Sequence, residues 1–313
     1  MRGAATDLLD YAERRARDAL GRFTATALTA TDWLEGDGVD DVDLAITVRV
    51  DITDGVFHVD FTGTAQAARG NVNCPLAVAR SAVLFVVRTL LPEDVPTNGG
   101  VQRTVRVTAP PGCLVNARYP SAVAAGNVET SQRIADTVFL ALAAGGISVP
   151  AQGQGTMNNV TLGAGGWTYY ETIGGGQGAS HGAPGPSGVH VGMSNTRNTP
   201  VEVLEMEYPL RVKSYALRRG SGGGGRWTGG EGVIREFVAL APMEASILAE
   251  RRRHAPRGAA DGRDGARGST CLNGAPLGPK VSVSLAPGDV LRLETPGGGG
   301  WGAGGKPERG DKG

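Results

Sequence analysis

The spacing of apolar residues predicts helices mainly in the first half of the chain. A helix is expected over 7–23, where apolar residues recur every three or four positions. A mostly buried helix is expected over 76–91, and a proline follows it. A third is expected over about 129–144, where two glycines follow and end it.

Strands are predicted where apolar and polar residues alternate or where β-formers cluster between turns. Alternation over 44–50 and 56–62 predicts two strands, and Asp54-Gly55 between them is typical of a hairpin turn. Six more strands are expected after residue 145, over 167–173, 210–218, 233–240, 243–250, 280–284 and 289–294. We therefore expect an α+β protein, with helices in the N-terminal half and a β-rich C-terminal half with glycine-rich turns.

This pattern divides the chain into three expected parts. Residues 1–150 would form an α+β part, 151–302 a β-rich C-terminal part, and 303–313 a polar, disordered tail. Within the second part, 255–279 is either a long loop at a subunit surface or a disordered insertion.

Composition narrows the class of protein. The 313 residues are 40% hydrophobic, which suffices for one large core or two smaller ones. Lys+Arg and Asp+Glu are both 31, so no basic excess indicates a nucleic-acid or membrane partner. The 50 glycines follow no Gly-X-Y period, which excludes collagen. Three widely spaced cysteines and no apolar leader favour a soluble cytoplasmic protein with reduced thiols.

Polar residues crowd against glycines in four clusters between Gly126 and Arg197. Glycine lets a ligand approach the backbone, and amide and carboxylate groups supply directional hydrogen bonds, so the clusters are predicted to line one site. The catalytic candidates are Glu129, Asn158 and Glu171. The candidates for substrate binding are Asn127, Thr130, Ser131, Asn159, Gly175, Gly176, His190 and Asn195. Glu129 could instead serve as a capping residue at a helix start.

Other chemistries fit the sequence less well. Residues 178–182 match the GxSxG nucleophile elbow, but Pro184 and Pro186 forbid the helix which that motif requires. The glycine runs 174–182 and 220–227 could bind an anion; we favour a turn for the second and leave a ligand-proximal loop open for the first. The four histidines form no paired metal motif, so the metal ligands are unknown.

Eight ordered motifs resemble the hydantoinase B/5-oxoprolinase family, which includes the B-type subunits of N-methylhydantoinases and the α-type subunits of acetone carboxylases. The resemblance covers about residues 7–302 and corresponds to the C-terminal part of family members. The motifs are DFTGTAQAARGNVNCPLAVARSAV (60–83), GNVETSQRIAD (126–136), QGTMNN (154–159), YYETIGGGQGA (169–179), MSNTRNTPVEVLE (193–205), RRGSGGGGRWTGGEGVIRE (218–236), LAERRR (248–253) and TPGGGGWG (295–302).

The resemblance implies a subunit, or part, of an ATP-dependent ring-opening amidohydrolase that acts on hydantoin, 5-oxoproline or another lactam. A hydantoinase A-type ATPase partner would activate the amide oxygen with ATP, and the B-type subunit would add water. The alternatives are an α-type subunit of an ATP-dependent ketone carboxylase and a truncated, non-catalytic assembly subunit. This chain alone is not expected to suffice for activity.

Two departures from the family pattern affect the metal. Family members usually have an N-terminal portion with Asp-Pro, His-Leu-Pro-Asp and His-His-Ala-Asp type motifs, which looks like the region of the metal ligands and has no counterpart here. The ligands of a divalent metal are therefore expected outside this chain, which would be a split subunit, a truncated one or a fragment. Many relatives also have His-Thr-His-Met where this chain has His-Val-Gly-Met at 190–193, which weakens a ligand role for His190.

Overall fold

The computed structural model describes residues 2–304. The chain divides into two compact units, with the boundary between Ser148 and Val149, and each unit is described by itself. The α+β expectation is confirmed, because most helices lie in unit 1 and unit 2 is built from antiparallel sheets. Residues 305–313 of the expected tail lie outside the described part of the chain. No helix within 2–304 is long and apolar enough to cross a bilayer.

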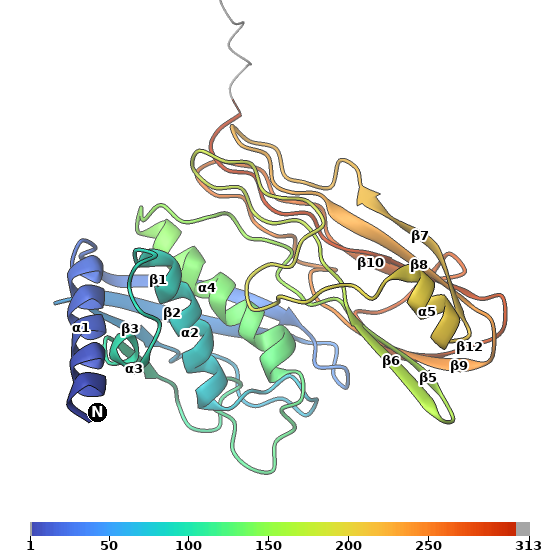
Figure 1. Ribbon diagram of the computed structural model, residues 1–313, viewed down its shortest axis with the longest axis horizontal. Coiled ribbons are helices and arrows are strands. Elements are labelled where there is room, and N and C mark those ends of the chain that lie inside the picture. The colour runs from blue at the N-terminus through green and yellow to red at the C-terminus, as the bar shows by residue number, and fades with distance from the viewer. Residues whose placement is uncertain (1, 305–313) are drawn as a thin grey trace, which may run out of the picture. The chain divides into compact units, whose positions relative to one another are not determined.

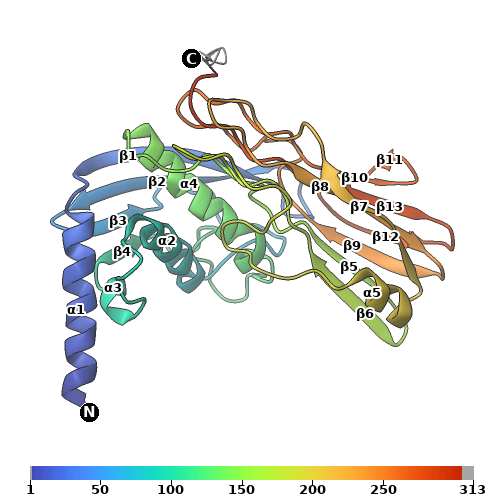
Figure 2. The ribbon, with the colours of Figure 1, turned by 45° about the horizontal axis from the view of Figure 1, so that its top comes forward.

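Unit 1 contains a four-stranded sheet in the order β1-β2-β3-β4 (Figures 1 and 2). The strands are β1 (Ala25–Glu35), β2 (Asp43–Thr53), β3 (Val56–Asp60) and β4 (Val105–Thr108). The first three pair antiparallel, and β4 pairs parallel to β3. The predicted hairpin is confirmed: Asp54 and Gly55 have φ of 53° and 67°, as a two-residue type I′ turn requires.

Helices cover this sheet (Figures 1 and 2). They are α1 (Arg2–Leu20), α2 (Leu76–Leu90), the short α3 (Gly99–Gln102) and α4 (Ser131–Ala144), which a single π-helical turn, η1 (Gly126–Thr130), precedes. α4 packs on β1 and β2, and α2 lies against α4 and near β4. The three predicted helices are confirmed, although the third begins earlier because the π turn is continuous with it.

One buried amide side chain holds the loops before α2 and α4 together. Asn73 is fully buried, and its Nδ2 donates to the carbonyl oxygens of Ala68, Gly70 and Ala122 at 2.9–3.0 Å. A Cβ on Gly126 would lie 2.3 Å from the Asn73 carbonyl oxygen, so only glycine fits at this approach. These contacts fix where the π turn begins.

Unit 2 is a sandwich of two antiparallel sheets, ordered β11-β10-β13-β8-β7 and β12-β9-β5-β6. Apolar residues from both sheets, such as Leu162 and Phe237, form one core. The elements are β5 (Asn159–Ala164), β6 (Trp167–Thr172), α5 (Val201–Glu207), β7 (Leu210–Arg218), β8 (Gly232–Ala239), β9 (Met243–Leu248), β10 (Ser269–Leu272), β11 (Ala275–Pro276), β12 (Lys280–Leu285) and β13 (Val290–Glu294). All six predicted strands of this half are confirmed, but β5, β10 and β11 were not predicted.

Five extended segments of unit 2 run side by side outside the sheets (Figures 1 and 2), and we call them the glycine bundle. They are 149–155, 174–189, 220–231, 256–266 and 295–302. The amides of Gly298, Gly299 and Gly300 donate to the carbonyl oxygens of Gly230, Gln152 and Arg263 at 2.9, 2.8 and 2.8 Å. Successive amides thus reach three different segments. A chain with three residues per turn, as in polyproline II, allows this, whereas a β-strand has a period of two.

Glycine is required in this bundle because the backbones approach closely. A Cβ on Gly298 would lie 2.0 Å from the Gln177 carbonyl oxygen, and one on Gly176 would lie 2.0 Å from that of Gly230. Neither glycine has a positive φ, so the requirement is space rather than backbone conformation. The glycine runs 174–182 and 220–227 are therefore packing segments. The second connects β7 to β8, as expected of a segment between strands, and a ligand beside the first stays a prediction.

The stretch 255–279 also has a definite structure. Residues 256–266 belong to the glycine bundle, and β10 and β11 follow. The interpretation as a disordered insertion is therefore wrong. Its position at a subunit surface stays a prediction.

We expect Gly298→Ala to lower the free energy of unfolding by about 3 kcal/mol, because the added methyl group must displace a buried backbone segment. Gly278→Ala is the matched control, since a Cβ there meets nothing within 4 Å and φ is not positive. Urea unfolding of both variants measures the difference. Equal midpoints would contradict the packing role of the bundle.

Candidate functional site

In unit 1, the π turn brings four candidate residues together. Glu129 is fully buried, and the hydroxyl of Thr130 donates to the Val72 carbonyl oxygen. The Ser131 hydroxyl donates to the carbonyl oxygen of Asn127 at 2.9 Å. Single π turns occur often at functional sites, because they reorient side chains within a helix. The residue at the N-cap position is Ala125, and Glu129 lies within the first turn after it, so Glu129 is not the capping residue.

One helical turn beyond Glu129, a buried ion pair crosses unit 1. The guanidinium of Arg133 on α4 is fully buried and lies 3.2 Å from a carboxylate oxygen of Asp32 on β1. Asp136 approaches the same Nη1 atom at 3.5 Å. Buried charges need such partners, because removal from water is costly. Sequence reasoning missed this pair, since Asp32 and Arg133 are 101 residues apart.

In unit 2, Asn158 belongs to a buried hydrogen-bond network. Its Nδ2 donates to Gln154 Oε1 at 2.8 Å, and its Oδ1 accepts from Arg252 Nη1 at 2.8 Å. Arg252 Nη2 also donates to the Thr270 hydroxyl at 3.2 Å. Asn158 is fully buried with a φ of 46°, a conformation that asparagine tolerates better than most residues. These contacts show that Asn158 stabilises the fold of unit 2, and its catalytic role stays a prediction.

The neighbouring candidates of unit 2 are also tightly packed. A Cβ on Gly175 would lie 2.1 Å from Gln154 Oε1, so Gly175 and Asn158 meet at the same side chain. Asn159 accepts a hydrogen bond from the Thr172 hydroxyl at 3.0 Å. Gln154 was not among the candidates, although it is the first residue of the QGTMNN motif. Its polar side chain, four residues before the candidate Asn158, was a signal in the sequence that could have identified it.

Glu171 lies inside the sandwich, where it pairs with a buried arginine. Both carboxylate oxygens are 3.3 Å from Nη2 of Arg235, which comes from the opposite sheet. The guanidinium also lies over the rings of Tyr215 and Phe237, at 4.6 and 4.8 Å from their centroids. Burial raises the pKa of Glu171, and Arg235 only partly opposes this rise. The arrangement is that of an ion pair joining two sheets, and a catalytic role for Glu171 stays a prediction.

His190 is held by the loop that carries it. Its Nδ1 is 2.7 Å from the Ser194 hydroxyl, and its Nε2 is 3.0 Å from that of Thr196. Burial lowers the pKa of His190, which favours the neutral ring. Asn195 in the same loop is exposed. Both ring nitrogens therefore have partners within the loop.

Two further chemistries do not fit the geometry. Ser180 and Ala183 exchange backbone hydrogen bonds in a tight turn with no helix after it, so the nucleophile elbow is absent. Among residues 2–304, no group of three or more His, Cys, Asp or Glu side chains could hold a metal ion. The residues present therefore do not fit a divalent-metal site.

The candidates fall into two groups, one in each unit. Asn127, Glu129, Thr130 and Ser131 belong to unit 1, and the remaining candidates belong to unit 2. That both groups line one site stays a prediction. In unit 2, three candidates meet at Gln154: Asn158 and Gly175 contact its side chain, and the carbonyl oxygen of Gly176 accepts from its backbone amide at 2.8 Å.

Comparison with known proteins identifies relatives. The family model described as hydantoinase B/oxoprolinase matches residues 1–304. The chain is 41% identical over 275 residues to 5-oxoprolinase 1 of Arabidopsis thaliana, covering 86% of this chain and 21% of that protein. It is 32% identical over 329 residues to the putative B-type subunit of a D-/L-hydantoinase from Pseudomonas sp. strain NS671, covering 96% and 55%. It thus spans between about a fifth and just over half of these relatives.

Two solved structures have the same fold. The ATP-dependent caprolactamase from Pseudomonas jessenii superposes with a TM-score of 0.86 at 24% identity, covering 96% of this chain and 56% of that one. A nucleotide-free acetone carboxylase superposes with a TM-score of 0.77 at 14% identity, covering 93% and 47%. At these identities the likeness concerns the fold alone.

We expect Arg235→Met to lower the free energy of unfolding by about 3 kcal/mol, because it leaves the Glu171 carboxylate buried without its counter-ion. Chemical denaturation followed by circular dichroism measures the loss. The double variant Glu171→Gln/Arg235→Met removes both charges and should recover most of it. A double variant as unstable as the single one would argue against the ion pair as the cause.

The raised pKa of Glu171 also predicts a pH dependence. Because the folded state holds this proton more tightly than the unfolded state, its contribution to stability is greatest at low pH. It declines as the pH rises from about 4.5, the ordinary glutamate value, through the folded pKa. The free energy of unfolding of the wild type, relative to that of the double variant, should therefore fall as the pH rises through this window. A pH-independent difference would exclude the raised pKa.

Proposed function

Because the chain belongs to the hydantoinase B/oxoprolinase family of ATP-dependent amide-hydrolysing enzymes, we propose that it forms part of an enzyme that opens a small cyclic amide. The match of the family model over residues 1–304 carries this proposal, since it spans both units. The relatives named as a 5-oxoprolinase and a hydantoinase support a lactam or hydantoin as the substrate. The B-type designation of the hydantoinase relative also supports an A-type ATPase subunit as the partner.

The role of ATP in such a reaction is to activate the amide for attack by water. A resonance-stabilised amide is a poor electrophile, and transfer of a phosphoryl group to its oxygen makes the carbonyl carbon reactive. Water then adds to this carbon, the ring carbon–nitrogen bond breaks, and the nitrogen leaves with a proton as an amine. A second water hydrolyses the resulting acyl phosphate to a carboxylate and phosphate. The partner subunit would bind ATP, and this chain would help to position the activated amide and the water.

Glu129 is the residue we propose for proton transfer. A carboxylate can take a proton from the attacking water and pass it to the leaving nitrogen. Its full burial on a π turn, beside Thr130 and Ser131, supports this role. Asn127, Thr130 and Ser131 are proposed to contact the substrate from the same turn. Asn158 and Glu171 already have structural partners, so their substitution would affect stability as well as chemistry.

There are two alternatives. One is a ketone carboxylase subunit, in which a carbon dioxide-derived carbon replaces water as the reacting group. The other is an assembly subunit without activity of its own.

Purification with candidate A-type ATPases, followed by assays with ATP, distinguishes these functions. Hydantoin and 5-oxoproline test ring opening, and acetone with bicarbonate tests carboxylation. We expect ADP and a ring-opened amino acid derivative from one of the cyclic amides. A carboxylated ketone would favour the first alternative. A stable complex that hydrolyses ATP without any such product would contradict our proposal and favour the second.

Glu129→Gln should lower ATP-dependent ring opening at least about 100-fold, since glutamine keeps the shape of the side chain but cannot transfer a proton. Binding to the ATPase partner should be retained. Glu93→Gln, at an exposed position of unit 1, is the control and should have wild-type turnover. Wild-type turnover by Glu129→Gln would remove this residue from the proposed chemistry.

A further inference from the structure

The sheet of unit 1 ends in an unpaired strand edge. The amides of Phe57 in β3 and of Phe61 just after it donate to the carbonyl oxygens of Thr104 and Thr108, both at 2.8 Å. Because peptide groups along a strand point alternately to its two sides, those of Val105 and Val107 point away from β3. No strand within residues 2–304 pairs with β4 on that outer side. Such an edge is a template for another strand.

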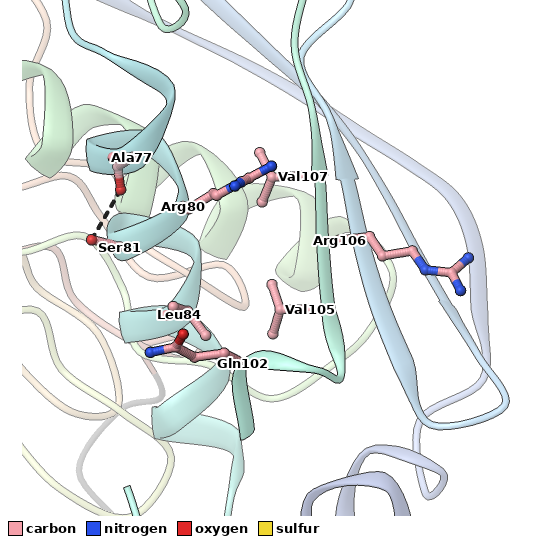
Figure 3. A pocket seen from close by; sticks show the side chains of 8 residues that line it. All are labelled: Ala77, Arg80, Ser81, Leu84, Gln102, Val105, Arg106 and Val107. Carbon is pink, nitrogen blue, oxygen red and sulfur yellow. Dashed lines mark hydrogen bonds between the residues drawn. The ribbon is translucent and has the colours of Figure 1, made fainter. Parts of the chain in front are cut away.

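A groove of about 580 Å³ lies along this edge, between α2 and β4 (Figure 3). Its helical wall is a stripe of Ala77, Ser81 and Leu84, which lie on one face of α2 at a spacing of four and three residues. Val105 and Val107 of β4 form the opposite wall. The small side chains of Ala77 and Ser81 leave room for a backbone to approach the helix. The groove therefore has the apolar lining and the open hydrogen-bonding edge that an added strand needs.

The charged groups of the groove have one sign. Among its eight lining residues, Arg80 and Arg106 are the charged ones, and both are exposed. Arg80 extends toward Val107, whereas Arg106 points away from the groove (Figure 3). Neither guanidinium forms an ion pair with the described residues. A strand placed beside β4 would thus meet a positive charge on each of its faces.

The geometry points to a docking site for an extended, acidic segment of a second polypeptide, which would add to the sheet beside β4. Its backbone would bond to the outward peptide groups of Val105 and Val107, as in other cases of β-strand addition. Its apolar side chains would contact Leu84 and the two valines on the groove side, and its carboxylates on the other face would pair with Arg106. The inference stands on unit 1 alone and does not depend on the proposed reaction.

A labelled, blocked peptide of alternating valine and glutamate tests this inference by fluorescence anisotropy with the full chain. We expect binding in the range of about 10–100 µM, which weakens with added salt. Arg106→Glu should weaken it at least about tenfold, because a repulsive charge replaces an attractive one. Arg118→Glu, at an exposed arginine outside the groove, is the matched control and should bind like the wild type.

Backbone methylation separates strand addition from simple charge attraction. Two peptide isomers are N-methylated on one or the other alternating set of amides, so that only one isomer keeps the donors that face β4. We expect one isomer to bind and the other to lose binding, and the wild-type protein suffices for this measurement. Hydrogen exchange of the Val105 and Val107 amides should slow at the same time. Equal binding of both isomers, or no binding of the unmodified peptide, would overturn the inference.

Discussion

Peptide groups that are removed from water must find hydrogen-bond partners, and in unit 2 part of this requirement is met outside the sheets. Gly297–Gly300 are buried, yet they belong to no strand. Their amides donate to neighbouring segments on different sides. Those segments lie so close that a Cβ on any of these glycines would clash with their backbone atoms. Since the bundle segments precede β5, follow β6 and β13, and join β7 to β8, this packing also fixes the ends of both sheets.

In unit 1, side chains meet the same requirement. Asn73 bonds to three carbonyl oxygens of two loops, and Thr130 bonds to that of Val72. The position of the π turn, and hence of Glu129, therefore depends on residues more than fifty positions earlier in the chain. The proposed chemistry relies on this support, because proton transfer needs a carboxylate in a fixed place.

Residue types alone indicated a polar site, but they did not distinguish chemistry from structural support. Glu171 resembled a candidate acid or base, whereas its partner Arg235 is 64 residues away and completes an ion pair between sheets. Asn158 likewise meets Arg252 at a separation of 94 residues. The group at 127–131 could be predicted as a unit, because one helical turn places neighbouring residues together. The buried arginines had no local signal, since a charge gains a partner only after distant elements pack.

The sequence by itself determined the elements with strong local periodicity, such as α2, the β2–β3 hairpin and β8, and the order of motifs that indicates the family. Periodicity is a local property, so it survives without knowledge of the fold. It missed β1, whose register is broken by an irregularity near Ala27, and β4, which has only four residues. Only the tertiary structure decided that the glycine runs form a packed bundle and that β4 lies at an open edge. Both depend on which segments become neighbours, and that is settled by packing across the chain rather than by any short stretch of it.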